Sequence, residues 1–384
     1  MALDIETRNQ LIETVRRFVR ERLVPIEAQV ASNDEVPAEI VQEMRELGLF
    51  GLSIPEEYGG LGLTMEEEVL VCLELGQTSP AFRSVIGTTV GIGSQGIIMF
   101  GNDEQKNEWL PKLASGEAIS SFCLTEPEAG SDAASVRTTA IPDGNEYVLN
   151  GTKRYITNAD RASVLTVMAR SNPATPGAKG ISSFVIPVDT PGITIGKPEA
   201  KMGQAGAHIC DVVFDDCRVP RSCLLGEEGQ GFKVAMQVLD RGRIHIASVC
   251  TGVAERLIRE SVQYAREREQ FGQAIGEFQL IQAMLADSQT ECFAARSMVM
   301  ETARQYDEGA SGVSMNASSC KLFASEMVGR VADRAVQVFG GAGYVTDYGI
   351  ERFYRDVRIF RLYEGTSQIQ QIVIARNLLR NLEV

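Results

Sequence analysis

The stretch that decides the fold class is Glu146-Tyr-Val-Leu-Asn-Gly-Thr-Lys-Arg-Tyr-Ile-Thr157, whose β-branched and aromatic residues are typical of a strand. Three further strand-like stretches lie nearby, at 163–170, 181–188 and 208–216. Turn residues separate them, and no helical run lies between them. The pattern from about 121 to 225 therefore predicts an antiparallel sheet or small barrel rather than βαβ units.

Helical patterns flank this region on both sides. Before it, apolar residues recur at three- and four-residue intervals from Leu11 to Leu23, and Thr64 with Glu67 predicts a capped helix. After it, long runs at 234–266, 278–307 and 316–339 suit a helical bundle. The order predicts an α+β protein with three domains: N-terminal helical (1–120), middle β (121–225) and C-terminal helical (226–384).

The composition limits the possible functions. The chain has 384 residues, of which 44% are hydrophobic and 23% charged, as in ordinary globular proteins. Its net charge of −14 argues against nucleic acid or an anionic membrane as a partner, and no apolar run is long enough to cross a bilayer. The acidic N-terminus resembles neither a secretion signal nor a transit peptide. We therefore expect a cytoplasmic, bacterial protein.

The cysteines and histidines do not predict a metal site. None of the eight cysteines forms a Cys-x-x-Cys pair, and the chain has two histidines, His208 and His245. Zinc sites need closer and more regular ligand spacing. We expect free, buried thiols in a reducing compartment and no bound metal.

One carboxylate near the C-terminus stands in apolar company, in Tyr363-Glu364-Gly365-Thr366-Ser367-Gln368. Ser367 with Gln370 predicts a capping box that starts a helix. A carboxylate in an apolar pocket has a raised pKa and can serve as a base toward carbon acids. The alternative is a helix-terminal acid that only favours the helix dipole.

Other motifs are more ambiguous. Gly91-Ile-Gly93-Ser-Gln-Gly96 matches a dinucleotide fingerprint but lies in a helical context, so close helix packing is favoured over nicotinamide binding. The loop Leu124–Asp132 offers hydroxyls and backbone N–H groups for a phosphate. Arg83 is the only charged residue between Glu74 and Asp103. If it is buried, it needs a protein acid or a ligand anion as its partner, and the sequence favours the protein acid.

Together these motifs resemble the FAD-dependent acyl-CoA dehydrogenase family, of the short- or medium-chain type, over essentially the whole chain. The most specific segments are Cys123-Leu-Thr-Glu-Pro-Glu-Ala-Gly-Ser-Asp132, Gln337-x-x-Gly-Gly-x-Gly-Tyr344 and Tyr363–Ser367. The resemblance implies an N-terminal helical domain, a middle antiparallel β-barrel or sheet domain and a C-terminal four-helix bundle.

The resemblance implies FAD between the β domain and the bundle. Residues matching flavin positions in the same subunit are Phe122, Leu124, Thr125, Ser131, Tyr155, Ile156, Thr157, Thr366 and Gln368. A second set matches positions that reach the FAD of a neighbouring subunit: Arg268, Gln270, Phe271, Gln337 and Gly341. This implies a homotetramer built as a dimer of dimers.

The implied reaction is α,β-dehydrogenation of an acyl-CoA thioester to a trans-2-enoyl-CoA. Glu364 matches the catalytic base, with hydride going to flavin N5 and electrons to an electron-transferring flavoprotein. Some family members carry their base at the position of Gly242, which cannot serve here. Positions matching the substrate site are Arg83, Ser84, Ser131, Asp240, Arg243, Tyr363 and Gly365.

The substrate stays open at this point. Arg83-Ser84 resembles the pair that receives the distal carboxylate in glutaryl-CoA dehydrogenases, which suggests a short dicarboxylyl-CoA as an alternative to a neutral acyl-CoA. A flavin oxidase or desulfinase on the same fold is a further alternative, as is a non-catalytic relative. Glu364 and Thr157 argue against the non-catalytic relative. The segment Met202–His208 departs from the family pattern, which puts the packing near the flavin in doubt.

Overall fold

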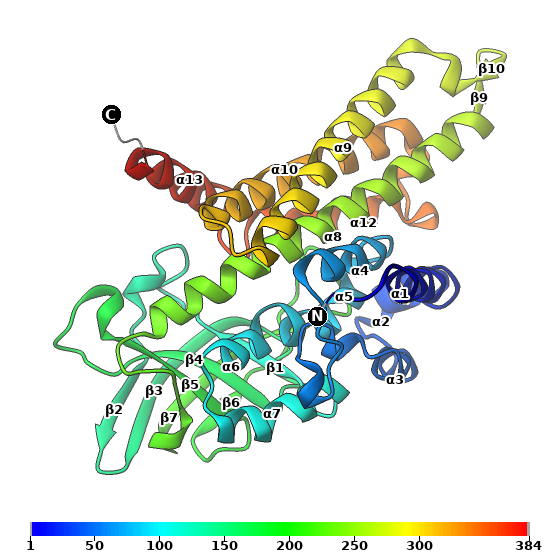
Figure 1. The fold of residues 1–384 in the computed structure, drawn as a ribbon. Coiled ribbons are helices and arrows are strands. Elements are labelled where there is room, and N and C mark those ends of the chain that lie inside the picture. Colours follow the sequence, from blue (N-terminus) through cyan, green and yellow to red (C-terminus); the bar gives the residue numbers. More distant parts are fainter. Residues whose placement is uncertain (1, 382–384) are drawn as a thin grey trace.

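The computed structural model describes residues 2–381, and Figure 1 shows a sheet beside a group of short helices, with long C-terminal helices projecting from both. The N-terminal helices are α1 (Ile5–Phe18), α2 (Glu27–Asn33), α3 (Ala38–Glu46), α4 (Met65–Leu75), α5 (Pro80–Gly87), α6 (Ser94–Phe100) and α7 (Asp103–Ser115). The predicted capping box starts α4: the Glu67 N–H donates to Thr64 Oγ1 and the Thr64 N–H donates to Glu67 Oε2.

Within residues 2–381, eight strands form one sheet in the order β6-β7-β3-β2-β4-β5-β8, with β1 paired to β4. Their bounds are β1 (Ser120–Cys123), β2 (Thr139–Asp143), β3 (Glu146–Thr157), β4 (Val164–Arg170), β5 (Ile181–Pro187), β6 (Ile193–Ile195), β7 (Ile209–Pro220) and β8 (Leu224–Leu225). The decisive stretch 146–157 is strand β3, between β7 and β2.

The sequence predicted an antiparallel sheet, but two strand pairs in the structure are parallel. β1 runs parallel to β4 over Ser120–Cys123, and β2 meets β4 in parallel at Thr139 and Arg170. A parallel pair needs a long connection between its strands. Here the connection from β1 to β4 contains the β2–β3 hairpin, which no local pattern distinguishes from an ordinary antiparallel meander.

The C-terminal region consists of long helices. α8 (Gly231–Glu267), α9 (Gln279–Asp307), α10 (Val313–Phe339) and α13 (Ser367–Asn381) are joined by the short helices α11 (Gly341–Tyr344) and α12 (Ile350–Asp356) and a small hairpin of β9 (Glu269–Gln270) and β10 (Gln273–Ala274). Figure 1 places this hairpin at the end of the bundle away from the large sheet. The α+β prediction with a C-terminal bundle is confirmed; the boundaries at 120 and 225 stay predictions.

One N-terminal helix belongs to the core of the bundle. Met65, Val69, Cys72 and Leu73 of α4 are buried in the same apolar cluster as the inner faces of α8, α9 and α10. Figure 1 shows α4 beside α8. α4 therefore connects the first helices of the chain to the bundle, and the site described below lies where these elements meet.

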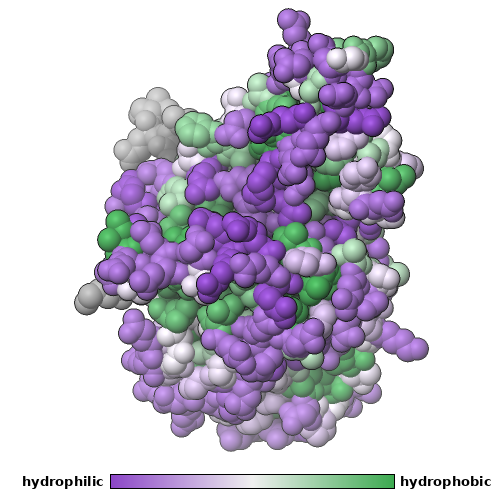
Figure 2. Space-filling model, turned by 90° about the vertical axis from the view of Figure 1, so that its right-hand side faces the viewer, coloured by the Kyte–Doolittle hydropathy of each residue, from purple (hydrophilic) through white to green (hydrophobic). Residues whose placement is uncertain are grey.

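The outer surface carries no large apolar area on the face shown in Figure 2, where hydrophobic patches stay small and separate among hydrophilic side chains. In the part of the chain that the structure describes, no helix has both the length and the apolar character needed to cross a membrane.

Candidate active site

Glu364 lies in an unusual turn just before α13. Its φ of 53° is in the left-handed region, and Gly365 follows with φ of 91°. A non-glycine residue held at positive φ costs on the order of 1–3 kcal/mol and persists only where the surroundings fix it. The turn aims the Glu364 side chain at the face of α8 that carries Gly242, so the strained residue is the one that bears the carboxylate.

Buried donors hold this turn from two elements. Lys321, fully buried on α10, donates from Nζ to the Gly365 carbonyl oxygen at 2.7 Å. Gln370, also fully buried, donates from Nε2 to the carbonyl oxygens of Glu364 at 3.1 Å and Gly365 at 3.0 Å. These three hydrogen bonds explain how the turn keeps its strained backbone.

The predicted capping box at Ser367 is wrong, although α13 does begin at Ser367. The N-cap is Thr366, whose Oγ1 accepts from the N–H of Ile369 at 3.2 Å. Ser367 instead donates to Glu326 Oε1 at 2.6 Å, and the Gln370 side chain is occupied by the turn. Thr and Ser are both good caps, and tertiary contacts decide between them here.

The Glu364 carboxylate is poorly solvated. The residue is half-buried as a whole, but its Oε2 is shielded from solvent and receives no hydrogen bond from any described residue. Burial raises the pKa of Glu364, and the positive charges of Arg83, Lys321 and Arg243 act against that rise. The group is therefore a base that binds a proton more tightly than an exposed carboxylate does.

Gly242 on α8 provides the room for this carboxylate. A Cβ atom added at residue 242 would overlap Glu364 Oε2 and would contact Cγ2 of Ile92 at 3.2 Å. Residue 242 and the Glu364 carboxylate are therefore direct neighbours, which agrees with the expectation that either position can present a base to the same substrate.

The structure brings together two of the segments predicted to line the flavin. The N–H of Arg154 donates to the Thr125 carbonyl oxygen at 2.8 Å, and Ser121 Oγ donates to the Thr157 carbonyl oxygen at 2.7 Å. Between Lys153 and Ile156 the pairing of β3 with β7 shifts register, and Tyr155 adopts a φ of 59°. Such bulges re-aim side chains, and Tyr155 is left 55% exposed.

The sequence reasoning missed a buried ion pair beneath these segments. Lys153 Nζ lies 2.6 Å from Glu126 Oε1, and both residues are buried. Glu126 also accepts from the N–H groups of Arg137 at 2.6 Å and Thr138 at 2.9 Å. It thus fixes both ends of the loop that carries the exposed Ser131. Alternate residues of a strand point to the same face, so Lys153 lies on the same face of β3 as the buried Tyr147. This spacing is the sequence signal from which the burial of Lys153 could have been predicted.

The residues predicted to reach a neighbouring subunit are all exposed and lie in the hairpin and around the end of α10. Phe271, at positive φ in the hairpin turn, exposes 94% of its surface. The set is Arg268, Gln270, Phe271, Gln337 and Gly341. Figure 1 places the hairpin away from the sheet, so Gln270 and Phe271 do not join the site built around β1 and β3 of the same chain.

Asp240 and Arg243, both predicted near the CoA part of the substrate, form a pair on α8. Arg243 Nη1 donates to Asp240 Oδ1 at 2.6 Å, and Ser314 Oγ donates to the same oxygen at 3.0 Å. Burial raises the pKa of Asp240 and lowers that of Arg243. Tyr363 and Gly365 are half-buried beside Glu364, and Gln368 is exposed on the first turn of α13.

Arg83 does not pair with an acid, contrary to the favoured prediction. It is 5% exposed, and its Nε donates to Nε2 of His245 on α8 at 2.8 Å. Its Nη2 is buried without a hydrogen-bond partner among the described residues. Ser84 donates to its own helix, at the Pro80 carbonyl oxygen, and to Gln204. No role for His245 could be assigned from the sequence, since it lies 162 residues away from Arg83.

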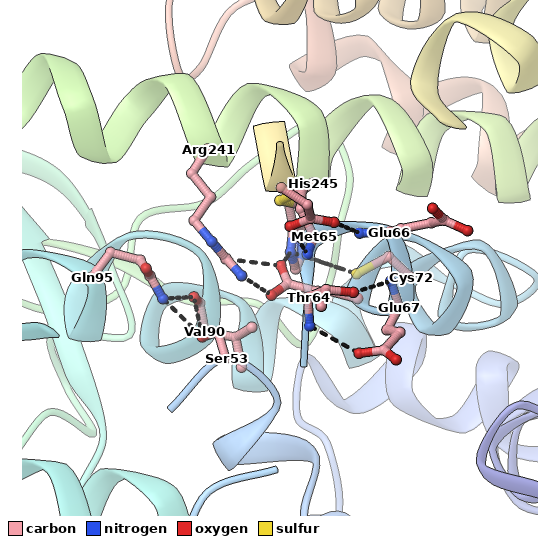
Figure 3. A network of polar contacts seen from close by, with 12 residues as sticks. Ser53, Thr64, Met65, Glu66, Glu67, Cys72, Val90, Gln95, Arg241 and His245 are labelled. Atoms are coloured by element: carbon pink, nitrogen blue, oxygen red, sulfur yellow. Dashed lines mark hydrogen bonds and ion pairs between the residues drawn. The ribbon is translucent and has the colours of Figure 1, made fainter. Parts of the chain in front are cut away.

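A cluster of Glu68, Cys72 and His245 has the atom types of a metal site, with the three atoms within 4.8 Å of one another. Figure 3 shows Arg241 and His245 reaching from α8 toward Cys72 on α4. Glu68 already forms a bidentate pair with Arg241, at 3.1 and 2.5 Å. Two guanidinium groups in contact with the cluster disfavour a divalent cation there.

His208 has a structural contact that the sequence did not reveal. Its Nδ1 lies 2.5 Å from Asp160 Oδ2, and its Nε2 lies 2.8 Å from the Asp34 carbonyl oxygen. The divergent segment Met202–His208 is thereby tied to α2 and to the end of β3. Gln204 in this segment, at φ of 53°, also donates to the Asp356 carbonyl oxygen.

The fold and this site define a flavoprotein dehydrogenase. Models of the acyl-CoA dehydrogenase N-terminal, middle and C-terminal domains match residues 5–117, 121–217 and 229–379. The chain belongs to the acyl-CoA dehydrogenase family and is an FAD-dependent oxidoreductase.

Two curated relatives illustrate the range of similarity. The chain is 43% identical to "Acryloyl-CoA reductase (NADH)" of Anaerotignum propionicum, over 97% of this chain and 95% of the relative. It is 41% identical to human "Short-chain specific acyl-CoA dehydrogenase, mitochondrial", over 98% and 91%.

Two solved structures superpose closely. Butyryl-CoA dehydrogenase from Megasphaera elsdenii has a TM-score of 0.94 at 35% identity, over 99% of this chain and 100% of that chain. A chain from "Electron transferring flavoprotein of Acidaminococcus fermentans: Towards a mechanism of flavin-based electron bifurcation" has a TM-score of 0.95 at 38% identity, over 99% and 100%.

The residues present fit FAD. Tyr155 and Phe271 expose large apolar surfaces that the chain's own core does not use, as a planar ring or an adjoining subunit would require. The loop with Ser131 is fixed at both ends by Glu126 and leaves its hydroxyl exposed. When bound, FAD would supply a hydride acceptor.

Proposed function

We propose that this protein dehydrogenates an acyl-CoA thioester to the trans-2-enoyl-CoA, with Glu364 as the base that removes the proton next to the thioester carbonyl. The observation that carries the proposal is the Glu364 Oε2 atom, which is buried, receives no hydrogen bond from the part of the chain that the structure describes, and faces the space left by Gly242. A desolvated carboxylate with a raised pKa is suited to take a proton from carbon.

The same turn supports a second role. The N–H of Glu364 has no acceptor among residues 2–381, while the carbonyl oxygens of Glu364 and Gly365 are already satisfied by Gln370 and Lys321. A free N–H next to the base can donate to the thioester carbonyl as enolate charge develops. Lys321 and Gln370 would then position both the base and this donor.

The Glu364→Gln variant tests the proposal. It keeps the shape of the side chain and removes the basic oxygen, so we expect full FAD content and a loss in kcat of about 10³-fold or more. Turnover with butyryl-CoA and flavin absorbance are the two readouts. Glu308→Gln, on the exposed end of α9, is the matched control. Wild-type turnover in Glu364→Gln would disprove the assignment.

A dicarboxylyl-CoA is the second candidate substrate, and the surroundings of Arg83 favour it. The positive charges of Arg83, Lys321 and Arg243 act on Glu364, and Asp240 pairs with Arg243. The two carboxylates, Glu364 and Asp240, balance two of these three positive charges and leave one uncompensated. The buried Nη2 of Arg83 has no hydrogen-bond partner within residues 2–381. A distal carboxylate on a short acyl chain would satisfy both the charge and the donor.

Anaerobic bleaching of the flavin by a panel of thioesters decides between the two candidates. Butyryl-, octanoyl- and isobutyryl-CoA represent neutral substrates, and glutaryl- and succinyl-CoA represent acidic ones. Two results together would identify Arg83 as the anchor: bleaching of the wild-type flavin by acidic thioesters alone, and a kcat/KM for those thioesters that falls by about 10- to 100-fold in Arg83→Lys. Bleaching by neutral thioesters with an unchanged kcat/KM in Arg83→Lys would leave Arg83 without contact to substrate.

Electron transfer and assembly complete the proposal. An electron-transferring flavoprotein as the acceptor is supported by the similarity to the chain from the Acidaminococcus fermentans study. A homotetramer is supported by the exposed hairpin, where Arg268, Gln270 and Phe271 would cover the FAD of another subunit. If the bleached enzyme is reoxidised by an electron-transferring flavoprotein and only slowly by oxygen, the protein is a dehydrogenase. Rapid reoxidation by oxygen would indicate an oxidase.

A further inference from the structure

A buried chain of four polar side chains runs from α4 to the neighbourhood of Glu364. Arg241 pairs with Glu68, Glu68 Oε1 lies 2.6 Å from Nδ1 of His245, and His245 Nε2 accepts from Arg83 Nε at 2.8 Å. Each of the four residues is at most 5% exposed. Figure 3 shows the α8 side of this chain, with Arg241 and His245 directed at α4.

The contacts determine the protonation of the chain. A guanidinium can only donate, so His245 Nε2 must accept from Arg83 and carries no hydrogen. The hydrogen of a neutral imidazole is then on Nδ1, where it donates to Glu68. Burial, followed by the charge of Arg83, lowers the pKa of His245 to about 4. Burial raises the pKa of Glu68, but the Arg241 charge and the His245 hydrogen bond outweigh it and lower that pKa to about 2.

The neutral partner has a consequence for Arg83. A carboxylate in the place of His245 would hold the guanidinium and also cancel its charge. The imidazole holds Nε without cancelling the charge, and that charge acts to lower the pKa of Glu364. The negative charge of Glu68 is matched by Arg241. This row of hydrogen-bonded side chains thus fixes the orientation of Arg83 and leaves its positive charge available to the site.

We propose that Glu68 and His245 form a buried relay that holds Arg83 beside Glu364, which makes His245 a positioning residue for the base. The inference rests on the proposed function of Glu364, and it holds for neutral and acidic substrates alike. Gly242, which meets the Glu364 carboxylate, and His245, which holds Arg83, lie three residues apart on α8 and therefore share one face of that helix. The positive charges that act on Glu364 are those of Arg83 from α5, Arg243 from α8 and Lys321 from α10. The relay acts on the first of them.

The pH profile of kcat/KM with a neutral thioester tests the relay. Without a well-placed cation the carboxylate binds its proton more tightly, so the acid limb in His245→Leu and in Arg83→Gln should move to higher pH by about 1 unit. His245→Gln keeps an acceptor oxygen for Arg83 and should keep the wild-type limb. The double variant should shift no further than Arg83→Gln alone, since both act through one contact. Cys72→Ala, whose thiol touches the same ring at 3.5 Å, is the packing control.

The outcomes separate the relay from the base. An unshifted limb in a folded, FAD-loaded His245→Leu would overturn the relay, whether or not Arg83→Gln shifts. Wild-type turnover in Glu364→Gln would overturn the proposed function instead.

The wild-type enzyme offers a second test that does not depend on any variant folding. With only two histidines, a ¹⁵N-histidine spectrum contains two ring systems, and His208→Gln assigns them. We expect His245 to be neutral with its hydrogen on Nδ1, unchanged between pH 6 and 9. A hydrogen on Nε2, or an imidazolium at pH 6, is incompatible with donation from Arg83 and would overturn the relay.

Discussion

At the scale of single residues, the site depends on what is absent at position 242 as much as on what is present at 364. The absence of a side chain on Gly242 leaves the volume in which the Glu364 carboxylate sits. A carboxylate displaced by one methyl group would still be a base, but it would no longer meet its carbon at the required distance. Geometry of this kind contributes to rate separately from pKa.

Gly242→Ala should therefore lower kcat by about 100-fold while FAD content stays near the wild-type value, because the new Cβ displaces Oε2 of Glu364 by a fraction of an ångström or more. Steady-state turnover with the best thioester of the panel measures this. Gly329→Ala on α10 is the control, since its added Cβ would meet only the Arg361 side chain at 3.6 Å. Equal kcat values for the two variants would contradict the account of Gly242.

At the scale of elements, the buried Lys153–Glu126 pair joins strand β3 to the loop that follows β1. Removal of one partner of a buried pair costs about 3–5 kcal/mol, because the other charge stays buried and unpaired. Lys153→Met should lower the free energy of unfolding by that amount, whereas Lys153→Met with Glu126→Gln should recover part of it. Urea unfolding of the FAD-loaded enzyme measures both; an equal loss in the two variants would argue against the pairing.

The elements also show which features a sequence can predict. Strand β3 was predicted to the residue, because β-branched and aromatic residues run through Glu146–Thr157 and turn residues separate it from its neighbours. β6 and β8 are three and two residues long, too short for any period to appear. The long helices α8, α9 and α10 were predicted within a few residues, but the parallel pairing of β1 with β4 depends on where the chain returns in space.

The candidate site divides in the same way. Glu364, the flavin segments, Asp240 and Arg243 could be proposed from the sequence because their signals lie within a few residues of one another, and their roles stay predictions. Lys321, Gln370, Glu68 and His245 were missed as contributors. Their contacts join residues far apart in the chain, such as Lys321 with Gly365 over 44 positions and Glu68 with His245 over 177. A single sequence contains no local pattern that reports such contacts.

At the scale of the whole molecule, the end of the bundle that carries the hairpin should be an interface. Phe271→Ala removes a ring that is 94% exposed in the single chain, so the folding of the chain should be unaffected. We expect Phe271→Ala to disrupt the proposed tetramer and thereby lower the FAD content. Light scattering coupled to size-exclusion chromatography measures the oligomeric state, and flavin absorbance measures the FAD content. Ile141→Ala, 40% exposed on β2, is the control. A Phe271→Ala tetramer with full FAD would contradict the assignment of this surface.

The position of α4 has a consequence for biosynthesis. The apolar face of α4 around Met65, Val69 and Leu73 is covered by α8 and α9, which begin 156 and 204 residues after α4 ends. Until those helices emerge, the nascent chain exposes this face, at a stage when exposed apolar surface promotes aggregation. This face of α4 therefore stays unpacked until the bundle is made, although the other N-terminal helices have an apolar cluster of their own. Cotranslational chaperones should find their binding site on the nascent chain at α4.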